Sequence, residues 1–194
     1  DVRQSAAGRT SAARVHLAAD EPRAALRALE PLAGPGADAA VLALYGRALL
    51  AAGDVEAAAR AYERSMARDA ALPEALFGRA QMAVRGRNPR EALFHLQRLD
   101  AALERSPRPA GFRLRSAILR GRAHLVAGRR TWARRILRRV VDQAGAPSAA
   151  WFHYARTEVG HDHAAAREAF QRYLELEPDG HYAPRARRAL RLDR

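Results

Sequence analysis

One stretch of this sequence occurs twice, and that self-similarity constrains the fold more than any other feature. The segment 46–53, GRALLAAG, matches the segment 121–128, GRAHLVAG, in both spacing and residue type. Each copy is followed at the same distance by a second amphipathic segment, in which an alanine precedes a large residue, Tyr62 or Leu137, by four positions. Self-similarity of this kind is typical of repeat architectures, in which each unit buries its apolar face only by stacking on its neighbours.

The composition favours helices throughout the chain. Of the 194 residues, 48% are apolar, which is typical of a globular protein and not of a disordered one. Long stretches of Ala, Leu and Arg place apolar side chains three or four residues apart, and no alternating run of β-branched residues occurs. We therefore expect an all-α fold.

Several classes of protein are excluded by what the sequence lacks. It contains no Cys, which excludes a disulfide framework, a thiolate zinc site and a cysteine nucleophile. No apolar run approaches the ~18 residues of a membrane-spanning helix. Because the chain starts at Asp1 without Met or a signal peptide, we expect it to be a fragment of a longer protein. All basic residues are Arg and none is Lys, which is typical of a GC-rich bacterium. The sequence does not determine the cellular compartment, and we favour the cytoplasm slightly over the periplasm.

The two copies resemble the tetratricopeptide repeat (TPR), a helix–turn–helix unit of about 34 residues. Its pattern has a large residue at position 4, small residues at positions 8 and 20, and a large or aromatic residue at position 24. Gly46 and Gly121 stand at position 8, and Tyr62 and Leu137 at position 24. The resemblance implies a TPR α-solenoid, a right-handed superhelix of antiparallel helix pairs.

In this register the chain 1–194 is a single array of about five repeats and a capping helix. The repeats span approximately 5–38, 39–72, 73–113, 114–147 and 148–180, and the capping helix spans 181–194. The third repeat carries seven extra residues before the fourth begins. Two prolines within the segment 106–111 predict a turn there, and we expect the preceding helix to run about one turn longer.

The resemblance also assigns a concave groove to the first helix of each repeat, mainly at positions 2, 5, 9 and 12. The residues expected to line it are Arg47, Leu50, Phe77, Gln81, Val84, Arg115, Ile118, Arg122, Leu125, Phe152 and Arg156. Position 9 is arginine in three of these repeats, with apolar residues on either side. Because arginine pairs with carboxylates in bidentate geometry, we expect an acidic or amphipathic segment of a partner protein in this groove.

Positive charge is concentrated in the fourth repeat. The net charge of the chain is +13, and residues 107–147 hold eleven arginines against one acid, Asp142. In the second helix of this repeat, arginine pairs alternate with apolar pairs, which predicts a buried apolar stripe that includes Trp132. The opposite, outer face is then a basic ridge that consists of Arg129, Arg130, Arg134, Arg135, Arg138 and Arg139.

Three functions fit these surfaces. The leading hypothesis is an interaction scaffold that binds an acidic or amphipathic segment through the groove, the basic ridge, or both. The alternatives are an electrostatic binder of nucleic acid or of an anionic membrane surface, and a structural spacer in a longer solenoid. No helix-turn-helix, zinc finger or aromatic stacking platform accompanies the ridge, so a protein partner is favoured over nucleic acid and membrane.

The sequence contains no constellation that predicts catalysis. It has no Ser/His/Asp arrangement, no phosphate-binding loop and no buried carboxylate pair, so we expect neither enzymatic activity nor a cofactor. The one group of potential metal ligands consists of His161, Asp162 and His163 in a turn, with His153 two helical turns earlier. No further ligand accompanies them, and we expect no metal site.

Overall fold

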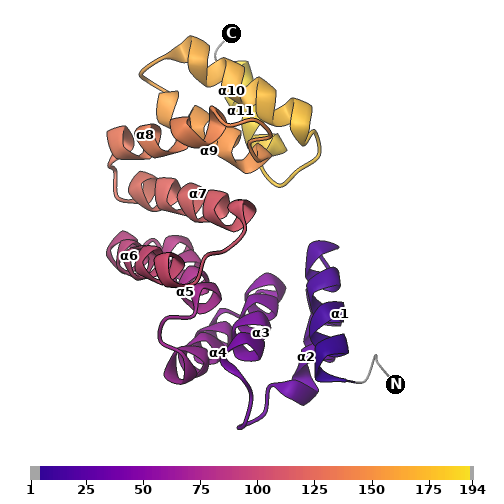
Figure 1. Ribbon diagram of the computed structural model, residues 1–194. Coiled ribbons are helices and arrows are strands. Elements are labelled where there is room, and N and C mark those ends of the chain that lie inside the picture. Colours follow the sequence, from indigo (N-terminus) through magenta and orange to yellow (C-terminus); the bar gives the residue numbers. More distant parts are fainter. Residues whose placement is uncertain (1–4, 193–194) are drawn as a thin grey trace. The chain divides into compact units, whose positions relative to one another are not determined.

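The computed structural model describes residues 5–192, and within this range the chain forms eleven α-helices, one short 3-10 helix and no strand (Figure 1). The helices are α1 (Ala6–Ala18), α2 (Pro22–Leu29), η1 (Glu30–Leu32), α3 (Ala39–Ala52), α4 (Val55–Arg68), α5 (Pro73–Arg85), α6 (Pro89–Arg105), α7 (Ala110–Val126), α8 (Arg130–Val141), α9 (Ser148–Glu158), α10 (His163–Leu176) and α11 (Ala183–Leu192). The all-α prediction is confirmed. Residues 193 and 194 of the predicted capping helix lie outside the described range. No described helix has the length and apolar character that crossing a membrane requires.

The helices divide into two compact units. Unit 1 comprises the residues up to 86 together with 91–107, and unit 2 comprises 87–90 together with the residues from 108 onward. Helices α1 to α5 and most of α6 therefore belong to unit 1, and helices α7 to α11 belong to unit 2. Each unit is described below by itself.

Short polar turns set the helix boundaries. Asp54 and Asp162 precede α4 and α10, and each carboxylate accepts a hydrogen bond of 2.9 Å from the third backbone N–H that follows it. Ser5 does the same for α1 at 3.1 Å. Such N-caps satisfy backbone donors that have no partner inside the helix. Gly53 ends α3 with a φ of 93°, a left-handed conformation that favours glycine.

In unit 1, one tyrosine fixes the approach of three helices. Tyr62 of α4 is only 1% exposed, and its ring lies against two glycines, Gly46 of α3 and Gly78 of α5. A Cβ atom at position 46 would lie 3.1 Å from the ring, and one at position 78 would overlap it. The small residue at position 8 thus admits the large residue at position 24, as the repeat pattern predicts.

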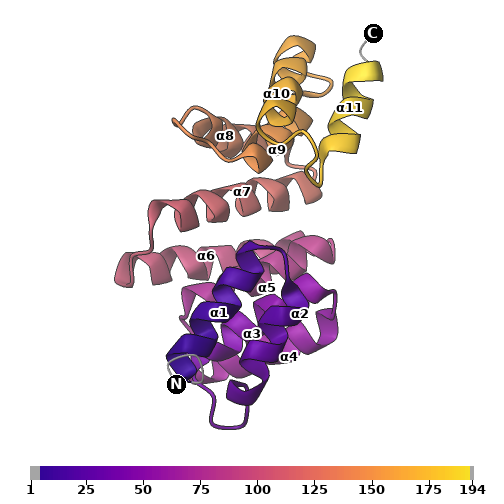
Figure 2. The same ribbon diagram turned by 90° about the vertical axis from the view of Figure 1, so that its right-hand side faces the viewer.

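Unit 2 repeats this arrangement with different residues. A Cβ atom on Gly121 of α7 would come within 2.6 Å of Cγ of Leu137 on α8, so only glycine permits this crossing. Towards the C-terminus, the Tyr182 ring stacks on Phe152 at 4.2 Å between centroids, and the Tyr182 backbone N–H donates to the Tyr173 hydroxyl. Figure 2 shows α11, which follows Tyr182, running beside α10.

The seven-residue insertion lengthens two helices. Helix α6 has 17 residues against 14 in α4, which confirms the expected extra turn. The prediction that all of 106–111 forms a turn is wrong, because Ala110 and Gly111 already belong to α7. Pro109 caps that helix, and its carbonyl oxygen accepts from the Phe112 N–H at 2.9 Å. Proline is tolerated at a helix start because the first N–H groups have no partner inside the helix.

Candidate functional site: an arginine ladder and an arginine cluster in unit 2

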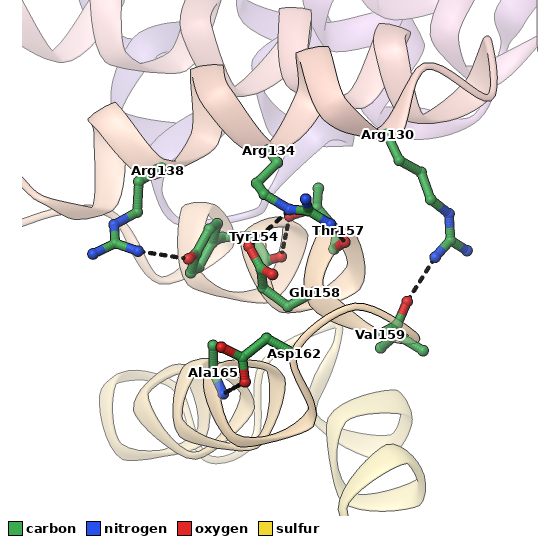
Figure 3. A network of polar contacts seen from close by, with 9 residues as sticks. All are labelled: Arg130, Arg134, Arg138, Tyr154, Thr157, Glu158, Val159, Asp162 and Ala165. Atoms are coloured by element: carbon green, nitrogen blue, oxygen red, sulfur yellow. Dashed lines mark hydrogen bonds and ion pairs between the residues drawn. The ribbon is translucent and has the colours of Figure 1, made fainter.

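Three arginines of α8 bind the neighbouring helix α9 (Figure 3). Arg130, Arg134 and Arg138 are spaced by four residues and so lie on one face of α8. In that order, their guanidinium groups donate to the carbonyl oxygen of Val159 (2.7 Å), the carbonyl oxygen of Thr157 (3.1 Å) and the hydroxyl of Tyr154 (3.1 Å). We call these three residues the arginine ladder.

The middle of the ladder is a buried ion pair. The Nε of Arg134 lies 3.1 Å from Oε1 of Glu158, whose side chain is only 4% exposed. A carboxylate at that depth is stable in its ionised form only beside an opposite charge. Arg134 therefore belongs to the packing of α8 on α9.

The predicted basic ridge is correspondingly smaller. The prediction that all six arginines form one surface open to a partner is wrong for Arg130, Arg134 and Arg138, whose guanidinium groups contact α9 or the residue that follows it. The three that remain, Arg129, Arg135 and Arg139, are exposed.

Trp132 does not belong to the buried stripe of α8, contrary to the sequence prediction. Its side chain is 51% exposed, and the Arg135 guanidinium lies 4.5 Å above its ring, within cation–π distance. The buried stripe consists of Ala133, Leu137, Val140 and Val141. Successive residues are 100° apart around a helix, so a stripe that includes residue 133 leaves residue 132 at its edge.

Five of the predicted groove residues fall in unit 1, and two of them are buried. Leu50 and Val84 are 3% and 5% exposed, which makes the prediction that they line an open groove wrong. Leu50 packs in the hydrophobic cluster around Tyr62. Phe77 and Gln81 are half-buried, and Arg47 is exposed.

In unit 2, the apolar groove residues at position 5 are core residues as well. Ile118 and Phe152 are 7% and 3% exposed and belong to one hydrophobic cluster, so the prediction that they contact a partner is wrong. Phe152 is covered by the Tyr182 ring. The remaining predicted positions keep some or all of their exposure, namely Arg115, Arg122, Leu125 and Arg156.

Three arginines of unit 2 lie near one another, on the first helices of the fourth and fifth repeats and on the capping helix. They are Arg122 of α7, Arg156 of α9 and Arg185 of α11, and we call them the arginine cluster. Burial lowers the pKa of Arg156 below its ordinary value, and the positive charges of Arg122 and Arg185 lower it further. Within the described part of the chain, none of the three forms an ion pair. This distinguishes them from the ladder.

A buried histidine lies beside the cluster. His153 is one helical turn before Arg156, is 2% exposed, and finds no hydrogen-bond partner for either ring nitrogen among residues 5–192. Burial holds its pKa well below the ordinary histidine value, and the charges of Arg122 and Arg156 act in the same direction. The imidazole is therefore neutral at neutral pH.

Sequence reasoning did not identify Arg185. The signal was available, because the fifth repeat is one residue short and the next repeat would begin at residue 181. With the capping segment treated as the first helix of that further repeat, Arg185 stands at position 5, one of the groove positions.

The turn between α9 and α10 shows no metal-binding geometry. Asp162 uses its carboxylate to cap α10, and His161 and His163 are exposed. Over the range that the structure covers, no three His, Cys, Asp or Glu side chains are grouped so as to hold a metal ion.

Comparison with known proteins finds likeness in structure only. No protein-family model matches the chain, and no curated protein sequence does. A chain of the APC/C hetero-tetramer Cut9–Hcn1 superposes with a TM-score of 0.80 at 16% identity, over 92% of this chain. This chain thus spans about a third of that protein, 35% of its length.

Two bacterial structures match over most of their length. TTC0263 of Thermus thermophilus, a thermophilic TPR protein, gives a TM-score of 0.74 at 19% identity, over 96% of this chain and 99% of that one. MamA of strain RS-1 gives 0.63 at 22% identity, over 88% and 93%. At these identities the likeness shows the fold, which is that of the TPR α-solenoid proteins.

Proposed function

We propose that this chain is a protein–protein interaction scaffold that binds an acidic segment of a partner protein through the first helices of unit 2. The fold supports a scaffold in general, because TPR arrays present helix surfaces to partners, but a fold alone does not determine function. One observation carries the specific proposal: Arg122 and Arg185 lie close enough to Arg156 for their charges to lower its pKa, and none of the three forms an ion pair within residues 5–192.

The charge distribution supports the same proposal. Residues 107–194 contain nineteen arginines and eight acids, so most of the net charge of the chain lies in this part. Like charges held close together repel one another, and an acidic segment removes that repulsion while it forms charge-assisted hydrogen bonds. Arg122 and Arg156 are both at position 9 of their repeats, where the TPR pattern places groove residues.

The proposal is tested by fluorescence anisotropy with a labelled peptide of alternating Glu and Leu, and a matched peptide with Gln in place of Glu. The full chain is compared with the double variant Arg122→Gln/Arg156→Gln and with the control Arg129→Gln/Arg139→Gln, which removes the same charge from α8 and the residue that precedes it. We expect the cluster variant to bind at least tenfold more weakly and the control to change affinity less than threefold. Equal losses in both variants, or equal binding of the Gln peptide, would contradict the proposal.

A second candidate function is electrostatic binding of single-stranded nucleic acid by α8. The exposed Trp132, with Arg135 over its ring, favours it, because bases stack on exposed aromatic rings beside arginines. A labelled single-stranded oligonucleotide in the same assay tests this candidate with the variant Trp132→Ala. Binding that is lost in this variant supports it, whereas unchanged or absent binding rejects it. Anionic vesicles in parallel test the membrane alternative, and failure of every ligand leaves the structural spacer.

A further inference from the structure

The arginine cluster has a geometry that brings its members to one place. Arg156 is three residues after His153 on α9, and Arg185 is three residues after Tyr182 at the start of α11. The rings of His153 and Tyr182 are in edge contact, with centroids 5.1 Å apart. Arg156 and Arg185 each lie one helical turn beyond that ring contact, and the charge of Arg185 reaches Arg156, whose pKa it lowers. Helix α7, which carries Arg122, packs against α9.

The acids of unit 2 are directed elsewhere. Six of them contact residues outside the cluster: Asp142 contacts Arg138, Glu158 contacts Arg134, Asp162 contacts the Ala165 N–H, Glu175 contacts Arg172, Glu177 contacts Ser148, and Asp179 contacts Arg187. The neighbouring imidazole of His153 is 2% exposed, and its two nitrogens have no hydrogen-bond partner within the described residues. The cluster is thus a concentration of positive charge and donors with which no carboxylate of the described residues forms an ion pair.

The amount of charge decides what kind of anion fits. One carboxylate carries a single negative charge and would leave two of the three guanidinium charges uncompensated. A phosphorylated serine carries a charge of about −1.5 to −2 at pH 7 and three strong acceptor oxygens. Three guanidinium groups supply forked donors that match those oxygens.

We propose that Arg122, Arg156 and Arg185 form a binding site for the phosphate group of a phosphorylated side chain in the partner segment. This inference rests on the proposed function and deepens it, because it names the anion that the cluster binds. It also makes partner binding dependent on phosphorylation, since the unmodified hydroxyl offers no charge to the cluster.

Three peptides that differ at one residue test the inference. They carry phosphoserine, Glu or Ser at the centre of the same Glu- and Leu-containing segment, and their affinities for the full chain are measured by anisotropy. We expect the phosphoserine peptide to bind at least tenfold more tightly than the Glu peptide. In Arg156→Gln and in Arg185→Gln that preference falls to within twofold, whereas Arg188→Gln, an exposed arginine of the same helix α11, retains it. Circular dichroism verifies that each variant is folded.

The outcomes separate the two proposals. Equal affinity for the phosphoserine and Glu peptides, with both weakened in Arg156→Gln, overturns the phosphate site and leaves the proposed function intact. No binding of any of the peptides overturns both. A preference for phosphoserine that survives in Arg156→Gln and Arg185→Gln shows that the phosphate binds elsewhere and overturns the assignment of these residues.

Discussion

The arginines of α8 and those of the arginine cluster belong to the same unit, yet their surroundings differ completely. Each ladder residue has an acceptor across the helix interface on or just beyond α9, and Arg134 also has a buried carboxylate. In the cluster, the charges of Arg122 and Arg185 lower the pKa of Arg156, and none of the three has an ion pair in the described part of the chain. The comparison teaches that the surroundings of an arginine, not its density in the sequence, determine whether it holds the fold together or remains available to a ligand.

The ladder arginines bind the C-terminal end of α9. The last carbonyl groups of a helix have no partner inside it and carry the negative end of the helix dipole. The carbonyl oxygens of Thr157 and Val159 lie at this end, and ladder arginines donate to both (Figure 3). Arg156 also belongs to the last turn of α9, so what separates the ladder from the cluster is the acceptor that each side chain reaches.

The largest effect on stability is expected at the middle of the ladder. Arg134→Ala leaves the Glu158 carboxylate buried without its counter-charge, and we expect a loss of about 3 kcal/mol in the free energy of unfolding. Urea denaturation followed by circular dichroism measures it. The matched control is Arg135→Ala, an exposed neighbour with an expected change of about 0.5 kcal/mol or less.

The partner variant sharpens this test. Glu158→Gln introduced into Arg134→Ala removes the unpaired charge, so part of the lost stability returns. Equal losses in Arg134→Ala and Arg135→Ala would show that the ladder does not stabilise the unit.

A smaller effect is expected beside the cluster, at His153. Its folded-state pKa lies below the ordinary histidine value, because of burial and then the charges of Arg122 and Arg156. Below pH ~6.5 the unfolded chain therefore binds a proton that the folded chain does not, and stability falls by up to about 1.4 kcal/mol per pH unit as the pH decreases. Above pH ~6.5 the histidine is neutral in both states, and this loss of stability is absent.

His153→Leu should remove the part of this pH dependence that comes from His153 and, by deleting a buried polar group without a partner among residues 5–192, raise stability at pH 7 by about 1 kcal/mol. Urea midpoints at pH 7.5, 6.5 and 5.5 test both parts. An equally steep decline in the variant would show that His153 is not the responsible group. The remaining decline should come from His95 and His124, whose pKa values are also lowered, chiefly by burial.

The smallest loss is expected at the exposed end of the ladder. Arg138 pairs with Asp142 and with Tyr154, but the Arg138 and Asp142 side chains are 61% and 57% exposed. Water screens such a pair, so Arg138→Ala should cost about 0.5 kcal/mol, well below Arg134→Ala. Thermal melts of the two variants side by side measure the difference, and a reversal of the order would contradict the importance of burial.

The repeat fold was predictable because its determinants are local. The glycines at position 8, together with Tyr62 and Leu137 at position 24, recur at fixed spacing, and the structure shows them in contact. The ladder was not predictable in the same way. Arg134 and Glu158 belong to different repeats and no helical period relates them, so the sequence shows a run of positive charge but not its internal acceptors.

The candidate site was predicted in part. Arg122 and Arg156, the arginines at position 9, keep exposure, whereas the apolar neighbours Ile118 and Phe152 are buried. Phe152 is covered because Tyr182 stacks on it, and that contact depends on how the C-terminal segment packs after α10. Spacing within one repeat does not determine such a contact.

The central claim is that the ladder arginines stabilise the fold whereas the cluster arginines bind a ligand. Its most direct test is the free energy of unfolding of Arg122→Gln/Arg156→Gln at low salt. If these residues serve a ligand, the double variant should be within about 0.5 kcal/mol of the wild type, or more stable because like-charge repulsion is relieved. Urea denaturation beside Arg134→Ala gives the comparison on one scale. A loss as large as that of Arg134→Ala would show that the cluster arginines are structural and would contradict their assignment as a binding site.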